Sequence, residues 1–367
     1  MERIEPARVP SPGESRGSPR CRHGAVARDA ATANGPPAWL ALLAPLLLAL
    51  ALAACGGGDA AAPEEDGELP PPSGRPALTL PDTIEIVSFV EGLRARMPAR
   101  GSGGYRPPLP FEVLSLRQAF DSLVAGNLEA ADRLLDRHDY DLVWTVERGT
   151  GDSVLVLGER PISNRHWGTY VFNPSRQATP TDIHVDHPLF DVNTDLLGAR
   201  MWQRCRCRWL FVAGAHRFAN EGDVADMARQ TESMFQVLHE AVAPDGFQAM
   251  SVHGFSAENH TPPTSTSDFV LSNGATSDGL VAPVDLARDL RLMLREAGFV
   301  VGLVGDDLGY DVLTGSPNPQ GIWSNENLGR GRWIHVEVER RLRTDAALRE
   351  AAAQVLGLWG KLSVGGA

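Results

Sequence analysis

Residues 208–252 read RWLFVAGAHRFANEGDVADMARQTESMFQVLHEAVAPDGFQAMSV, and this stretch decides the fold class. It begins with the apolar run 208–213 and ends with the apolar run 247–252, each as long as a buried strand. Between them, residues 222–242 place apolar side chains at helical spacing. A strand, a helix and a second strand in this order predict parallel strands in a sheet that is covered on both faces.

The same alternation continues on both sides of this stretch. Upstream, a Gly-rich turn at 149–152 separates two short apolar runs and predicts a hairpin. We expect strands at 142–146, 154–157, 169–172, 182–185, 268–272, 299–304 and 333–338, and helices at 82–98, 110–138, 193–204, 284–297 and 344–359. The pattern predicts an α/β fold with three layers, α/β/α, around a mixed and mostly parallel sheet. Residues 139–367 would form this α/β domain, after a helical extension over residues 82–138.

Composition narrows the classes of partner. The chain has 367 residues and a net charge of −12, and an acidic surface repels phosphate, so we expect no nucleic-acid partner. Cys205 and Cys207 are too close in sequence for an unstrained disulfide, and no CxxC pair is present. We therefore expect neither a disulfide framework nor a cysteine-bound metal.

An uncharged apolar run at residues 39–54 ends in Leu52-Ala-Ala-Cys55. Its length of about 16 apolar residues falls short of the ~20 that a membrane-spanning helix needs, although such an anchor is the alternative. The run and its small-residue end resemble a bacterial lipoprotein signal, in which the cysteine becomes the lipidated first residue. On this interpretation residues 1–54 are a signal peptide, Cys55 carries the lipid and residues 55–81 are a flexible tether. The lipid anchor would then hold the chain on a membrane of the bacterial cell envelope.

Histidine, arginine and carboxylate side chains follow five of the predicted strands, at the edge where open α/β sheets bind ligands. His187 follows the strand 182–185, Asp191 comes one short loop later, and His253 follows the strand 247–252. Two imidazoles, a carboxylate and an open position match a catalytic zinc site, so these three residues are the predicted Zn²⁺ ligands. Each histidine taken alone would more often be a hydrogen-bonded, half-buried side chain.

Two further histidines leave the ligand set open. In a regular strand, His184 faces the side opposite to His187. Pro188 cannot donate to a sheet ladder, so the strand is expected to end near His187. His216 follows the strand 208–213, and the pattern does not decide whether His184 or His216 joins the metal.

Glu337 lies in the last predicted strand, Trp333-Ile-His-Val-Glu-Val338. Alternation places the isoleucine and both valines on one face and Glu337 with His335 on the other. Glu337 is therefore either on the solvated face of an edge strand or beside the metal, as the general base toward a water molecule. The helix 344–359 follows at once and should pack on the sheet, which favours the buried position.

The order of these features resembles the zinc carboxypeptidase-type hydrolases, most closely the poly-γ-glutamate hydrolases and N-formylglutamate amidohydrolases. The resemblance covers roughly residues 140–360 and implies His187, Asp191 and His253 as metal ligands and Glu337 as the catalytic base. The carboxypeptidase pair H-x-x-E is absent, and the chain has the pair H-x3-D, His187 and Asp191, at this place instead. For the arginine that grips a substrate carboxylate, Arg217 is our candidate.

Two functions of different classes fit this sequence. The first is a zinc-dependent amide or peptide hydrolase acting on a peptide or acyl amino acid, with Arg332 and Tyr310 behind Arg217 as substrate-binding candidates. The second is a non-catalytic ligand-binding lipoprotein. A two-lobed receptor would need two α/β repeats, and one run of strands favours the enzyme. A hydrolase fold with a decayed site is also compatible. Motifs of serine hydrolases, H-E-x-x-H metalloproteases and nucleotide-binding loops are absent from the sequence.

Overall fold

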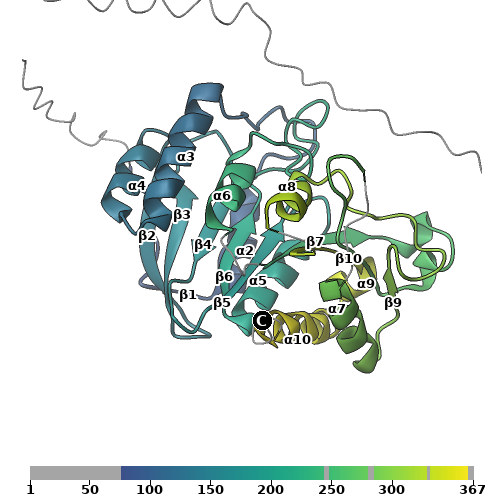
Figure 1. Cartoon of the computed structure of the whole chain (residues 1–367). Helices are drawn as coiled ribbons and strands as arrows, with labels where there is room; N and C mark the ends of the chain where they lie inside the picture. Colours follow the sequence, from purple (N-terminus) through teal and green to yellow (C-terminus); the bar gives the residue numbers. More distant parts are fainter. Residues whose placement is uncertain (1–75, 244–247, 280–284, 329–330, 363–367) are drawn as a thin grey trace, which may run out of the picture. The chain divides into compact units, whose positions relative to one another are not determined.

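The described residues form a ten-stranded mixed sheet with the strand order β1-β2-β3-β4-β6-β5-β7-β10-β8-β9 (Figure 1). The structure is a computed structural model and describes residues 76–243, 248–279, 285–328 and 331–362. The strands are β1 (Thr83–Ile84), β2 (Tyr140–Glu147), β3 (Ser153–Glu159), β4 (Thr169–Phe172), β5 (Thr179–Val185), β6 (Cys207–Val212), β7 (Gln248–Phe255), β8 (Phe269–Ser272), β9 (Val301–Leu303) and β10 (Trp333–Glu339). The predicted signal peptide, Cys55 and most of the predicted tether lie outside the described residues.

Parallel pairing joins the strands in the middle of the sheet. β6, β5, β7 and β10 are parallel neighbours, whereas β2, β3 and β4 form an antiparallel flank. β8 runs antiparallel to β10. The strands predicted near residues 183, 210, 250, 302 and 335 therefore share one sheet, which confirms the predicted α/β class.

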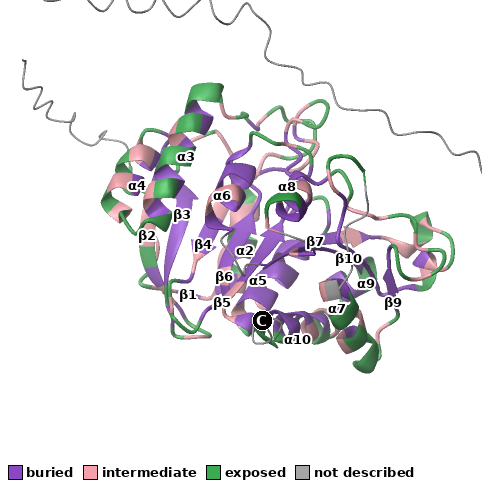
Figure 2. Ribbon diagram, viewed as in Figure 1, coloured by how far each residue is buried: buried purple, intermediate pink, exposed green. Residues whose placement is uncertain are grey.

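Helices cover both faces of the sheet, and most residues of the central strands between them are buried (Figure 2). One layer holds α2 (Ile86–Leu93), α5 (Thr194–Cys205), α7 (Asp285–Glu296) and α10 (Ala346–Leu362). The other layer holds α3 (Pro110–Val124), α4 (Leu128–Asp136), α6 (Met234–Val242) and α8 (Pro319–Asn327). Side chains alternate between the layers, so Ile183 packs toward α5 while His184 packs on Phe211 and Phe235 in the second layer. Residues 82–138 contribute α2 and α3 to these same two cores.

Several predicted helices differ from the observed ones. The predicted helix 222–242 is helical only over α6, because the Asp226 carboxylate accepts from the backbone N–H of Ala228 and holds a turn. Ser233 then caps α6 by accepting from the N–H of Gln236. The predicted helix 110–138 is divided into α3 and α4, and Asn127 caps the second of them. The helix α8 was not predicted, although a capping Asn318 and a proline at its first position mark its start.

Cys205 and Cys207 form a disulfide between α5 and β6, although their separation of two residues argues against an unstrained one. Arg206 between them has φ 53°, a left-handed conformation that folds the chain back on itself. The two Cα atoms are consequently 5.0 Å apart, within the range that a disulfide spans. Among the described residues, no helix combines the length and the apolar character needed to cross a bilayer.

Candidate metal centre

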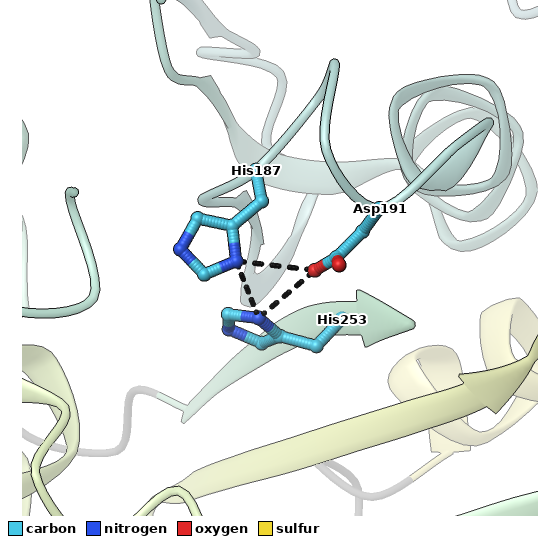
Figure 3. A group of neighbouring side chains, drawn as sticks. All are labelled: His187, Asp191 and His253. Carbon is cyan, nitrogen blue, oxygen red and sulfur yellow. Dashed lines mark hydrogen bonds and ion pairs between the residues drawn. The ribbon is translucent and has the colours of Figure 1, made fainter. Parts of the chain in front are cut away.

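His187, Asp191 and His253 converge at the carboxyl ends of β5 and β7 (Figure 3). His187 Nδ1 lies 3.1 Å from Asp191 Oδ2 and 3.1 Å from His253 Nδ1. His253 Nδ1 lies 3.3 Å from Asp191 Oδ2, which closes a triangle of three possible ligand atoms. All three side chains are buried.

The size of this triangle fits a zinc ion. Four ligands at ~2.0–2.1 Å in a tetrahedron stand roughly 3.3–3.4 Å from one another. The three observed separations of 3.1–3.3 Å are close to this spacing. Two nitrogens and one oxygen leave a fourth position for water or substrate, as in catalytic zinc sites.

A carboxylate holds the outer nitrogen of His187. His187 Nε2 donates to Asp226 Oδ1 over 2.7 Å, and the other oxygen of Asp226 accepts from the guanidinium of Arg217. A donor hydrogen on Nε2 leaves the Nδ1 lone pair free for a metal, which is the arrangement found around histidine ligands in metalloproteins.

His253 is held in the same way by another carboxylate. Its Nε2 lies 3.2 Å from Asp186 Oδ2, which also accepts from Ser251 Oγ and from Asn318 Nδ2. Both histidines therefore point Nδ1 at the centre of the triangle and Nε2 at a carboxylate. This matched orientation is difficult to explain by packing alone, since either ring could otherwise present its other nitrogen.

The electrostatics of the cluster favour a cation. Burial by itself would raise the pKa of Asp191 and lower the pKa of His187 and His253, because it disfavours charge. Hydrogen bonds and opposite charges outweigh burial, so the pKa of Asp191 lies below its usual range and the pKa of each histidine lies above it. Burial also opposes the ionisation of Asp186 and Asp226. The neighbouring histidines outweigh this effect of burial, so the pKa values of both carboxyl groups are lowered. A metal ion would have to displace histidine protons, so its affinity for the site should decrease as the pH is lowered.

Glu337 borders a cavity of about 420 Å³ that opens beside the cluster. β10 lies between β7 and β8, and all of its residues are buried, so the interpretation of Glu337 as part of a solvated edge strand is wrong. Glu337 is the register neighbour of His253 on β7, and its side chain is 10% exposed. Oε2 of Glu337 has no hydrogen-bond partner among the described residues. The cavity is also lined by Phe190, Asp191, Val192, Arg217, Phe255, His260, Leu313, Arg340 and Arg343.

Arg343 ties the loop that carries Asp191 to the ends of two strands. Its guanidinium donates to the carbonyls of Val192, Phe255 and Val338 over 2.6–3.0 Å. Gly254 makes this possible, because a Cβ at that position would lie 2.3 Å from Cζ of Arg343. Burial lowers the pKa of Arg343, and its contacts make it a clamp on the ligand loop.

The other sequence candidates lie elsewhere or have partners. His184 packs on Phe211 inside the second layer, and burial lowers its pKa to about 4. His216 accepts from the N–H of Phe218 through Nδ1 and is not among the possible ligands in the described residues. The Tyr310 hydroxyl pairs with Ser267 Oγ, and neither Tyr310 nor Arg332 lines the cavity. Arg217 does line the cavity while it is bound to Asp226.

Sequence reasoning missed the two carboxylates that orient the histidines. Asp186 directly precedes His187, and its position beside a proposed ligand was a usable signal. Asp226 lies 39 residues from His187 inside a segment predicted to be helical, so its role required the three-dimensional structure.

Comparisons with known proteins give solved structures only. No protein-family model matches the chain, and no curated protein matches it. A bacteriophage poly-γ-glutamate hydrolase is 15% identical with a TM-score of 0.35, over 53% of this chain and 90% of that protein. The LapA aminopeptidase of Legionella pneumophila is 11% identical with a TM-score of 0.34, over 76% and 70% of the two chains. A carboxypeptidase A candidate from Shewanella denitrificans is 10% identical with a TM-score of 0.32, over 64% and 68%. Because these values are low, residue roles must come from the geometry of the chain itself.

Proposed function

We propose that this chain is a zinc-dependent hydrolase of amide or peptide bonds, held at the bacterial cell envelope by a lipid on Cys55. The matched orientation of His187 and His253 supports the metal most directly. Each ring presents Nδ1 to Asp191 Oδ2 and Nε2 to a carboxylate outside the triangle. The buried carboxylate of Glu337 at the adjoining cavity supports an enzyme over a site that only holds a metal.

His187, Asp191 and His253 would hold the zinc ion. When bound, zinc would polarise the scissile carbonyl and lower the pKa of a water ligand toward ~7. Glu337 Oε2 accepts the proton of the attacking water and delivers it to the leaving nitrogen, which balances the hydrolysis of one C–N bond. Asp226 and Asp186 keep the two imidazoles oriented throughout.

The cavity suits a substrate with a carboxylate. Arg217 and Arg340 line the cavity, and Arg340 is exposed, with its only ion pair in the described residues a 3.7 Å contact to Glu258. Phe190 and Val192 add apolar surface, each more than 40% exposed. A peptide or an acyl amino acid meets both requirements, and we place poly-γ-glutamate, wall peptides and N-acyl glutamate in the first panel of substrates.

Metal analysis of the purified full chain tests this function. We expect about one zinc per chain. His253→Ala should lose zinc, while His260→Ala, which changes another histidine of the cavity, should retain it. Glu337→Gln should keep zinc and lose turnover by ~10²–10⁴-fold, because only the proton acceptor is removed. A chain that binds no zinc and hydrolyses none of the panel would instead be the non-catalytic binding lipoprotein.

The anchor is tested separately. Cys55→Ser should move the protein from the membrane fraction to the soluble fraction, because the thiol is the site of lipid attachment. Fractionation followed by immunoblotting measures this, with Cys21→Ser as the matched control that should stay with the membrane. A Cys55→Ser protein that still pellets with membranes would contradict the lipoprotein assignment.

A further inference from the structure

His335 is a buried histidine that the mechanism above does not use. It lies two residues before Glu337 on β10, so both side chains point to the same face of the sheet. On the neighbouring strand β7, Ser251 is the register partner of His335 and His253 is that of Glu337. His335 therefore lies next to Glu337 and one register position farther from the strand end than His253, and it is 5% exposed.

One hydrogen bond connects the two residues. His335 Nε2 donates to Glu337 Oε1 over 3.0 Å. The other oxygen, Oε2, has no partner among the described residues. A carboxylate at the end of a flexible side chain can present either oxygen, and a donor on one of them fixes which oxygen is left for the cavity.

Three neighbours enclose the imidazole of His335. Its ring lies against the ring of His253 at a centroid distance of 4.4 Å and stacks on Trp333 at 5.6 Å. Gly315 closes another side, since a Cβ there would lie 2.7 Å from Cγ of His335. Gly315 also has φ +62°, which other residues rarely adopt, so the close approach is built into the backbone.

We propose that His335 is a positioning residue for Glu337. It holds Oε1 through Nε2–H, so that Oε2 stays free to take the proton from water and pass it to the leaving nitrogen. His335 keeps its own proton throughout. This inference rests on the proposed function, because it assigns a role toward the base of that reaction.

Three substitutions separate the hydrogen bond from the packing. His335→Phe preserves a ring and removes the donor, whereas His335→Gln keeps an amide N–H near the position of Nε2. His335→Asn has the same amide on a shorter side chain that does not reach Oε1. His184→Phe is the matched control, a buried histidine of the same sheet whose ring contacts Phe211 and Phe235 rather than Glu337.

The experiment measures kcat, KM, zinc content and Tm for each full-length variant on one substrate of the panel. We expect His335→Phe and His335→Asn to lose ~10- to 100-fold in kcat with KM, zinc and Tm close to parental values. His335→Gln should recover most of this loss, and His184→Phe should match the parent. In the Glu337→Gln background, His335→Phe should cause no further loss of kcat, because His335 acts on the reaction only through Glu337.

The outcomes distinguish this inference from the proposed function. If Glu337→Gln keeps the parental kcat, the assignment of the base fails and this inference fails with it. If Glu337→Gln is impaired while His335→Phe stays within about twofold of the parent, only the positioning role is overturned. Equal losses in His335→Gln and His335→Asn would likewise overturn it, since the amide of the former should replace the donor.

Discussion

Asp226→Asn is the sharpest test of the metal centre, because it changes a partner of a proposed ligand and leaves every ligand in place. Asp226 accepts from His187 Nε2 through Oδ1 and from Arg217 through Oδ2. An asparagine has one acceptor and one donor end, so it faces either His187 or Arg217 with an N–H group. It also removes the negative charge that holds the outer proton of His187. Loss of such a partner costs ~10- to 100-fold in metal affinity, or about 1.4–2.7 kcal/mol.

Competition for zinc against a chromophoric chelator at neutral pH measures this affinity. Asp152→Asn is the matched control, because Asp152 is a buried carboxylate that pairs with Arg206 and Asn173 away from the triangle. It should lose some stability and no zinc affinity. A folded Asp226→Asn protein whose zinc affinity stays within about twofold of the parent would refute the proposed orientation of His187.

Two further predictions concern pH and packing. Burial raises the pKa of Glu159 from 4.5 to about 7, despite hydrogen bonds from Trp167 and Ser163, so the folded state keeps a proton that the unfolded state releases between these values. The contribution of Glu159 to the free energy of unfolding is fully present below pH ~4.5 and is lost as the pH rises to ~7. Glu159→Gln should remove this pH dependence, so that the variant becomes more stable than the parent by about 3 kcal/mol over this range. Denaturant unfolding at several pH values measures the difference. Gly254→Ala should displace Arg343 from its three carbonyl partners, which should lower the free energy of unfolding by ~1–3 kcal/mol and weaken zinc binding. Gly92→Ala is the control and should not lower stability, because the space around its Cβ is open. Equal stability of the two variants would contradict the role of Arg343 as a clamp.

Residues next to a strand end could be placed from the sequence, because alternation and chain breaks are local properties. Pro188 marks the end of β5, and His187 and Asp191 follow within one loop. His253 lies inside the last part of β7 rather than after it, yet it faces the same edge. The approach of these three side chains to one another agrees with the predicted ligand set, while their binding of zinc stays a prediction.

The order of strands in the sheet could not be read from the sequence. β10 is the last strand of the chain, and it inserts between β7 and β8 instead of adding to an edge. Local pattern gives the faces of a strand, but its neighbours depend on which long-range pairings bury the most surface. Long-range contacts of side chains are hidden from the sequence for the same reason. Neither the hydrogen bond between His187 and Asp226 nor the ring contact between His253 and His335 was predicted.

The central place of β10 also explains why its polar face indicates function. In the middle of a covered sheet, a carboxylate loses its water, and that loss destabilises the fold unless hydrogen bonds replace it. Glu339 has such replacement, because it accepts from the backbone N–H of Arg341 over 2.7 Å and caps the helix that follows. Glu337 has a partner on only one oxygen within the described residues. Apolar residues there would extend the core, so a half-satisfied carboxylate beside His253 supports the role of proton acceptor that we propose for Glu337.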